Sequence, residues 1–421
     1  MYYTTTNILD INMENSAMVR YSNINTTVSV NLWDNEDYLG EVNDPSYHSI
    51  HKVAILLVKV LFPVFVAVGT VSNILIIVVL RRGAINTDNL SFFLSALAVV
   101  DTVFLYTSAF KSWIRVIWGV EFLHFGSWSC KLGLFLNHLS LTLSAWLVVV
   151  IAWQRWYTCS RPFDRCCPVE SARCGYIGLA CLVLVLVGAN SYVLVTAEYH
   201  ESSWGRSCAP APEHDGAISE VFPYLLVLLY SGLPALLLIV LNGLLARVLY
   251  TSRRSLLSHT ESSRTRGRHD GHVRARYNYV TVLLLALSLS WLVLTSPHTL
   301  LKFAEHIPES SFQSATFTFL NVLFFIFLYV NHSINFFLYC ALTKGFRREV
   351  RRIASNIKSL IIFLSHSCCS RPRRQHLDAS NTNSHHSHTD SFMPLLEQNV
   401  LKYRQAHNGY NLHPAHGLTA C

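Results

Sequence analysis

Charged side chains are scarce in this 421-residue chain, in which Asp, Glu, Lys and Arg together make up 14% of the residues. Soluble globular domains carry about a quarter of such residues, so the soluble globular class is excluded. The formal net charge of +8 does not indicate nucleic-acid binding, because acidic residues crowd the N-terminal segment while arginines lie in short loops between apolar runs. We therefore expect no nucleic-acid partner.

The motifs of several enzyme and metal-site classes are also missing. The sequence contains no His-Glu-x-x-His motif, and no nucleophile motif surrounds Ser144, although Ser144 and His332 could form a dyad in principle. The close Cys-x-x-Cys spacing of zinc sites is missing among Cys159, Cys166, Cys167 and Cys174. The sequence therefore predicts a protein that is not an enzyme.

What the chain has instead is seven long apolar runs, at residues 53–80, 90–110, 130–152, 176–195, 222–249, 280–301 and 312–342. A membrane-spanning helix needs about 20 mostly apolar residues, because lipid offers no partner to an unpaired backbone group. The runs predict an all-α fold, a seven-transmembrane helix bundle that crosses the plasma membrane several times. The odd number of spans and the missing internal repeat count against a polytopic membrane transporter, which is the alternative function class.

Arginine clusters indicate the orientation of the chain. They follow the first, third, fifth and seventh runs, and Lys and Arg in short loops mark the cytoplasmic side. We therefore expect the N-terminus outside, with residues 1–52 as a flexible extracellular segment. Residues 53–352 form the predicted transmembrane domain, and residues 353–421 a disordered cytoplasmic tail. No signal-peptide core precedes the first run, so that run is expected to act as its own insertion signal.

The cysteines can be assigned to the two sides of the membrane. Cys130 and Cys208 face the oxidising outer space and are expected to form a disulfide, with two free thiols as the less favoured alternative. Cys368 and Cys369 lie beside arginines on the inner side and are candidate lipidation sites. Asn25, in an Asn-Thr-Thr sequon of the outer segment, is the candidate glycosylation site.

Polar residues inside the apolar runs predict a buried site. Asp101 lies in the middle of the second run, Ser144 midway along the third, and Asn331 and Asn335 one turn apart on the seventh. A carboxylate at membrane depth needs partners. We expect these residues to hold a small cation, sodium, as the one cofactor. The alternative is that each residue pairs locally as helix–helix glue, which is favoured for a single Asn or Ser but weak for Asp101.

Most of the runs also carry a short motif. These are GTVSN at 69–73, LAVVD at 97–101, Cys130 followed by Gln154-Arg155-Trp156, Pro234, Pro297, and NHSINFFLY at 331–339 with Phe346 and an Arg cluster after it. In this order they resemble the rhodopsin-like (class A) G-protein-coupled receptors across residues 53–352. The resemblance implies a receptor without catalysis that activates heterotrimeric G proteins, and a short amphipathic helix after the seventh span.

The resemblance also implies roles for single residues. Gln154, Arg155 and Trp156 stand at the family's Asp-Arg-Tyr position and are the expected G-protein coupling site. Since Gln154 replaces the acid, we expect Arg155 to be restrained less tightly at rest. The implied activation switch consists of Thr295, Pro297, Asn335 and Tyr339. Ser and Thr residues at 380–391 predict phosphorylation and arrestin binding, and an inert solvated tail is the alternative.

The kind of ligand follows from the outer ends of the helices. Asn137 stands where amine receptors carry an Asp, and Tyr329 where opsins hold the retinal-binding Lys, so an amine and a retinal are disfavoured. Cations such as Lys111 and Lys302 could contact acidic or carbonyl groups of a peptide, although singly such residues are more often membrane anchors. With Asn137 they form the predicted ligand site. The departures from the common pattern resemble invertebrate neuropeptide receptors of the FMRFamide-receptor-like kind.

Overall fold

The structure, a computed structural model, describes residues 45–83, 88–161, 172–202, 205–210, 224–225, 227–259, 267–304 and 315–369. The chain falls into two compact units, Met1–Leu360 and Ile361–Cys421, and each is described by itself. Seven helical segments of the described chain are long and apolar enough to cross a bilayer, which confirms the predicted fold class.

Several of the spans are built from more than one helical element. In chain order the spans are α2 (Pro45–Arg81); α3 (Asp88–Leu105), η3 (Tyr106–Phe110) and α4 (Lys111–Trp118); α5 (Ser127–Ser160); α6 (Ala172–Asn190) and α7 (Tyr192–Thr196); η7 (Leu228–Gly232) and α9 (Leu233–His259); α10 (Gly267–Ala304); and α11 (Ala315–Leu342). The elements η3 and η7 are single π-helical stretches. Such wide turns inside helices are frequent at functional sites.

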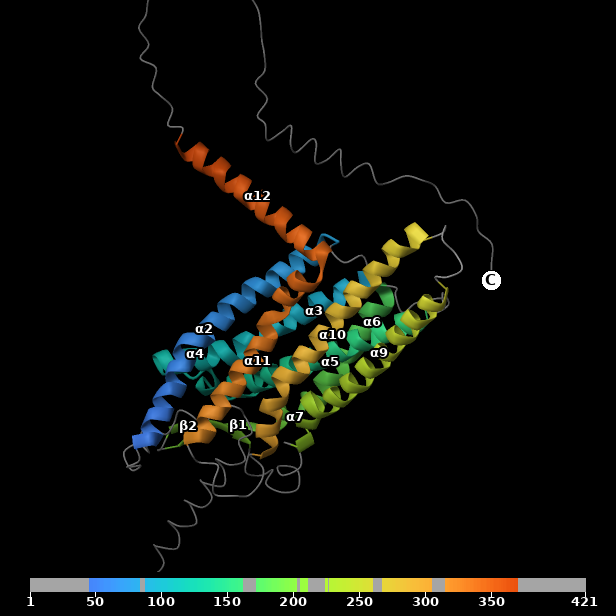
Figure 1. Cartoon of the computed structure of the whole chain (residues 1–421). Helices are drawn as coiled ribbons and strands as arrows, with labels where there is room; N and C mark the ends of the chain where they lie inside the picture. The colour runs from blue at the N-terminus through green and yellow to red at the C-terminus, as the bar shows by residue number, and fades with distance from the viewer. Residues whose placement is uncertain are drawn as a thin grey trace, which may run out of the picture. The chain divides into compact units, whose positions relative to one another are not determined.

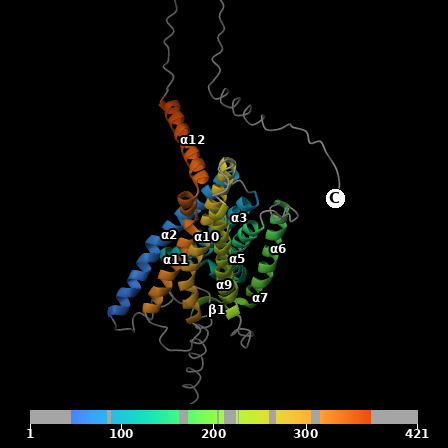
Figure 2. The same cartoon turned by 45° about the vertical axis from the view of Figure 1, so that its right-hand side comes forward.

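The third span lies at the centre of the bundle. In α5, 67% of the most apolar window is buried, whereas the fourth span, built from α6 and α7, buries 17% of its window. Figure 2 agrees with this difference, since α6 lies at one edge of the bundle and α2 at the opposite edge, whereas in the view of Figure 1 α6 overlaps other helices. The helix α11 packs against both α2 and α10. A residue that points inward from α5 or α11 can therefore reach several other helices.

Gly69 allows α2 to approach α3 and α11 closely. A Cβ atom at this position would overlap Leu105 and would lie 2.8 Å from Ser333 Oγ. The hydroxyl of Ser333 donates to the carbonyl oxygen of Tyr329, one turn earlier on α11, at 2.8 Å. The missing side chain thus fixes where α2 meets the middle of α11, which is the level of the polar residues described below.

A β-hairpin covers one end of the bundle. Strands β1 (Ala197–Ser202) and β2 (Gly205–Pro210) pair antiparallel, with Tyr199 opposite Cys208. A disulfide joins Cys208 to Cys130 near the start of α5, as the sequence predicts, with their Cα atoms 5.7 Å apart. We call this end of the bundle the disulfide end.

The helix after the seventh span is longer than predicted. The sequence predicts a short amphipathic helix, whereas α12 (Lys344–Cys369) has 26 residues. Arg347 connects it to α11, because its Nη1 donates to the carbonyl oxygens of Cys340 at 2.8 Å and Ala341 at 2.6 Å. The fully buried Phe346 packs edge-on against Tyr339, with ring centroids 5.4 Å apart. We call this end of the bundle, which also holds Arg155, the arginine end.

Candidate functional site

Four polar residues meet in the middle of the bundle. The carboxylate of Asp101 on α3 accepts three hydrogen bonds: Oδ1 from Ser144 Oγ at 2.8 Å and from His332 Nδ1 at 2.7 Å, and Oδ2 from Asn335 Nδ2 at 2.7 Å. The side chains of Asp101 and His332 are each 1% exposed. We call Asp101, Ser144, His332 and Asn335 the Asp101 layer.

The Asp101 layer differs by one residue from the predicted set. Ser144 and Asn335 contact Asp101 as expected, but Asn331 is buried without being one of its hydrogen-bond partners. His332 takes that place, and the sequence prediction left it out. Its spacing was a usable signal, because residues three apart on a helix share a face, and His332 precedes Asn335 by three.

The first span supports this layer from outside. Asn73 on α2 is fully buried, and its Nδ2 donates to the backbone carbonyl oxygen of His332 at 3.3 Å. The ring of Phe104 on α3 lies 4.4 Å from the imidazole of His332, centroid to centroid. The position of His332 is thus set by an amide, an aromatic ring and a carboxylate from two other helices.

A second group of polar residues lies between the Asp101 layer and the disulfide end. These side chains are buried, and among the described residues the following atoms have no hydrogen-bond partner: Asn137 Oδ1, Thr295 Oγ1, His298 Nδ1 and Nε2, and Asn321 Oδ1. We call Asn137, Thr295, His298 and Asn321 the outer polar cluster. Buried polar atoms are nearly always paired in native proteins, so each of these needs an explanation.

His298 is the most unusual member of the outer polar cluster. It is 1% exposed, follows Pro297 in α10, and packs against the ring of Phe325 at 4.8 Å. Lys302, one turn further along α10, is 5% exposed and close enough to interact electrostatically with His298. The sequence prediction named Lys302 but missed His298, because a single His in an apolar helix carries no sequence signal.

The predicted ligand residue Lys111 belongs to the second span at the same end. It starts α4 and interacts electrostatically with Glu121, which also forms an ion pair with Arg115 at 3.0 Å. The Nδ1 of His138 on α5 donates to the carbonyl oxygen of Leu134 at 2.9 Å, and His138 interacts electrostatically with Lys111. The disulfide end therefore gathers cations as well as unpaired polar atoms.

The predicted coupling residues lie at the arginine end of α5. Gln154 and Arg155 are 7% and 5% exposed, and Trp156 is partly buried against the hydrophobic core. The Oε1 atom of Gln154 is buried and has no hydrogen-bond partner among the described residues. Of the predicted switch residues, Tyr339 is 1% exposed and lies on α11 one turn after Asn335.

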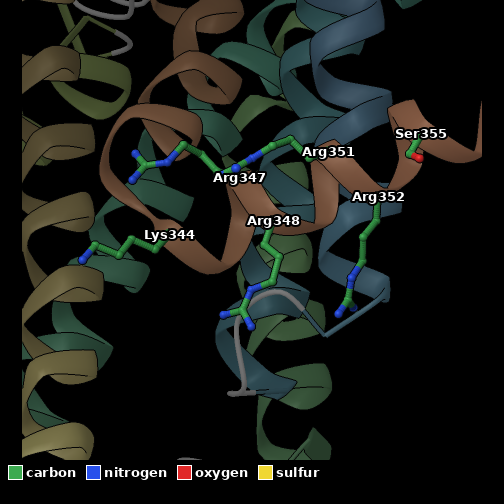
Figure 3. Close-up of a pocket in the computed structure, with 6 residues that line it drawn as sticks. All are labelled: Lys344, Arg347, Arg348, Arg351, Arg352 and Ser355. Atoms are coloured by element: carbon green, nitrogen blue, oxygen red, sulfur yellow. The ribbon is translucent and has the colours of Figure 1, made fainter. Parts of the chain in front are cut away.

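The first turns of α12 present a strongly basic groove. Its lining residues are Lys344, Arg347, Arg348, Arg351, Arg352 and Ser355. Figure 3 shows that these side chains project from one helix in several directions. Arg352 contacts Glu349 at 2.7 Å, the one acidic residue of this helix. Further along α12, the apolar side chains of Ile357 and Leu360 are 51% and 56% exposed.

Some predicted sites lie outside the described side chains. Asn25 and residues 380–391 are not among the described residues, so glycosylation and phosphorylation stay predictions. Cys368 and Cys369 form the end of α12, and their side chains are not described. Their lipidation also stays a prediction.

Comparison with known proteins agrees with this arrangement. The chain is 24% identical over 375 residues to G-protein coupled receptor dmsr-1 of Caenorhabditis elegans, over 77% of this chain and 72% of that protein. It is 23% identical to bombesin receptor subtype-3 of Ovis aries, over 71% and 74% of the two chains. It is 22% identical to galanin receptor 2a of Danio rerio, over 73% and 80%.

The family described as 7 transmembrane receptor (rhodopsin family) matches residues 72–339, more than half of the chain. The match begins next to Asn73, contains the Asp101 layer and the outer polar cluster, and ends at Tyr339. The chain belongs to the rhodopsin family of seven-transmembrane receptors.

Proposed function

We propose that an extracellular peptide binds at the disulfide end of this receptor and that a heterotrimeric G protein binds at the arginine end. Membership of the rhodopsin family makes the chain a G-protein-coupled receptor of the plasma membrane, not an enzyme or a transporter. Two of the similar receptors are named for the peptides bombesin and galanin. Disulfides form in oxidising compartments, so we assign the disulfide end to the outside.

The observation that carries the peptide proposal is the outer polar cluster. It offers unpaired buried acceptors and a histidine whose two ring nitrogens have no described partner. A peptide carries amide donors and carbonyl acceptors along its whole length, so it can satisfy several such atoms at once. The cations Lys111 and Lys302 at this end suit a ligand that also carries an acidic or carbonyl group.

The proposed mechanism is a shift between two arrangements of the helices. A peptide that binds the active arrangement more tightly raises its population. Helix movements of this kind are amplified because packed cores are bistable rather than continuously deformable. In this proposal Arg155 contacts the G protein, and the Asp101 layer connects α3, α5 and α11 between the two ends.

A peptide library tested on cells that report calcium and cAMP examines this proposal. We expect at least one peptide to signal through the parent receptor, and the response to disappear in Arg155→Ala at matched surface expression. Activation by a biogenic amine, combined with no response to any peptide of the library, would contradict the peptide proposal.

We propose two further partners, a membrane surface and arrestin. The basic groove of α12, followed by the exposed Ile357 and Leu360, suits a helix that lies on the anionic inner leaflet with its apolar side chains in the lipid. Phosphorylation at 380–391 would recruit arrestin. Truncation after Arg374 tests the arrestin proposal, and unchanged internalisation would contradict it.

A further inference from the structure

We infer that the Asp101 layer binds a proton, not a metal cation, and that His332 makes this choice. The inference goes beyond the proposed function and holds whatever ligand the receptor binds, because it depends only on the contacts inside the bundle. The sequence predicted a sodium site at Asp101. The hydrogen bond from His332 to Asp101 argues against sodium there.

The hydrogen bonds around Asp101 leave little room for a metal ion. Oδ1 accepts from both Ser144 Oγ and His332 Nδ1, and Oδ2 accepts from Asn335 Nδ2. A carboxylate offers about four lone-pair positions, so three of them are already used by protein donors. A metal ion at Oδ1 would have to displace the imidazole nitrogen, which lies 2.7 Å away.

The chemistry of the surrounding atoms also disfavours sodium. Hard cations are held by several oxygen atoms, as Ca²⁺ and Mg²⁺ sites show. The imidazole of His332, which lies on Oδ1, offers a cation no oxygen, and the amide of Asn335 would have to turn its Oδ1 to the site in place of the Nδ2 that donates to Asp101. Asn331, the amide that the sequence added to the set, does not contact Asp101 through a hydrogen bond. The residues present therefore do not fit a sodium ion.

A proton can balance the negative charge of Asp101 without a metal ion. A carboxylate at membrane depth is costly unless its charge is balanced. One proton shared by Asp101 Oδ1 and His332 Nδ1 makes the pair neutral, whichever of the two atoms holds it at a given moment. The ring of Phe104, 4.4 Å from the imidazole, favours a positive charge on His332 as aromatic rings do for other cations.

No other described group close to the pair competes for this role. On α2, Asn73 faces His332, and the nearest described cation of that helix is Arg81, two turns beyond Asn73. On α5, Ser144 faces Asp101, and His138 binds a backbone carbonyl nearer the disulfide end.

Further titratable groups lie on the last two spans. Among the described side chains of α10 they are His298 and Lys302, and His298 packs on Phe325, two turns of α11 before His332. On α11 itself, Tyr329 pairs with Ser108 at 2.8 Å, and Tyr339 lies two turns after His332.

The test measures the thermal unfolding of the purified full-length receptor in sodium chloride and in choline chloride at equal ionic strength. A cation that binds the folded state raises Tm. We expect the same Tm in both salts for the parent. The variant His332→Asn keeps the carboxylate and replaces the imidazole by an amide, whose oxygen can bind a cation. In this variant we expect sodium to raise Tm. The double variant Asp101→Asn/His332→Asn should lose this response.

Two outcomes would overturn the inference. The first is a sodium-dependent rise in Tm of the parent that Asp101→Asn abolishes, and this result needs no variant of His332. The second is a folded His332→Asn receptor that does not respond to sodium, since the imidazole would then not be what excludes the cation. If His332→Asn does not fold, His332→Ser offers a hydroxyl oxygen in its place and is judged by the same criterion.

Discussion

Two groups of buried polar residues lie within the same helix bundle and differ in how their polar atoms are hydrogen-bonded. In the Asp101 layer, each carboxylate oxygen is paired, and the helices α5 and α11 supply the partners. In the outer polar cluster, five buried atoms on α5, α10 and α11 have no described partner. The two groups are equally buried, so exposure to solvent does not explain the difference.

The difference shows which group forms most of its hydrogen bonds without a ligand. A buried hydrogen bond contributes little net stability, but a buried polar atom left without a partner costs its full desolvation. Within the Asp101 layer only Nε2 of His332 bears that cost among the described residues, whereas the outer polar cluster bears it at five atoms. We therefore assign the Asp101 layer to the stability and switching of the bundle, and the outer polar cluster to binding.

The largest effect is expected from removing the acid at the centre of the paired group. Asp101→Ala leaves three donors without an acceptor, and breaking a buried ion pair from one side costs about 3–5 kcal/mol. The Tm of the purified receptor should fall accordingly. Thr102→Ala is the matched control, because the neighbouring hydroxyl bonds within its own helix, to Ala98 at 2.8 Å. Equal falls in Tm for Asp101→Ala and Thr102→Ala would contradict the claim that the Asp101 layer stabilises the bundle.

The disulfide is expected to have the next largest effect. Cys208→Ala frees the hairpin β1–β2 from α5, and native disulfides typically contribute about 2–4 kcal/mol. We expect a fall in surface expression and in Tm. Cys130→Ala should lose as much, and the double variant no more, because both changes remove one bond. Cys181→Ala, at an exposed free cysteine of α6, should change nothing.

At the arginine end, the buried Oε1 atom of Gln154 has no described hydrogen-bond partner, like the unpaired atoms of the outer polar cluster. An acid in its place would attract Arg155 by about 1 kcal/mol in a half-hydrated site. We therefore expect ligand-independent signalling that Gln154→Glu lowers several-fold and that Arg155→Ala removes.

Basal signalling in these variants is measured in reporter cells at matched surface expression. Thr158→Ala, one turn further along α5, is the control. Basal activity that Gln154→Glu leaves unchanged would show that another contact restrains Arg155.

The smallest effect on stability is expected in the outer polar cluster. His298→Leu removes two unpaired nitrogens, so the free energy of unfolding should change by less than about 1 kcal/mol. The potency of a peptide agonist should nevertheless fall by about tenfold or more, which corresponds to about 1.4 kcal/mol.

Asn190→Ala is the reciprocal control, because this fully buried amide is paired with Leu186 at 2.8 Å. The Asn190→Ala receptor should be less stable than the parent, and the potency of the peptide agonist on it should be unchanged. Unchanged agonist potency on the His298→Leu receptor would show that the outer polar cluster does not bind the ligand.

The spans could be predicted from the sequence because lipid imposes a simple requirement on length and polarity. The apolar run 130–152 lies within α5, and the run 312–342 overlaps α11 to within a few residues. Polar extensions could not be predicted in this way: α10 begins at Gly267, before its apolar run, because a helix can continue into water. The π-helical turn η3 depends on packing and leaves no mark in hydropathy.

The candidate site could be predicted in part. Asp101, Ser144 and Asn335 were found because polar residues at membrane depth are rare. His332 was absent from the predicted set, although its spacing of three from Asn335 places both side chains on the face of α11 that meets Asp101. Thr295 and Asn137 were named, but the sequence does not show that their side-chain oxygens and the ring nitrogens of His298 have no partner among the described residues, because that depends on how the helices pack.

The assignment of binding to one group and switching to the other is tested most directly with one labelled peptide agonist and two variants. Binding and G-protein activation are measured for His298→Leu and Asp101→Asn at matched surface expression. The account predicts that His298→Leu loses peptide binding and keeps basal signalling, while Asp101→Asn keeps binding and loses agonist-induced activation. Lost binding in Asp101→Asn together with full binding in His298→Leu would contradict it.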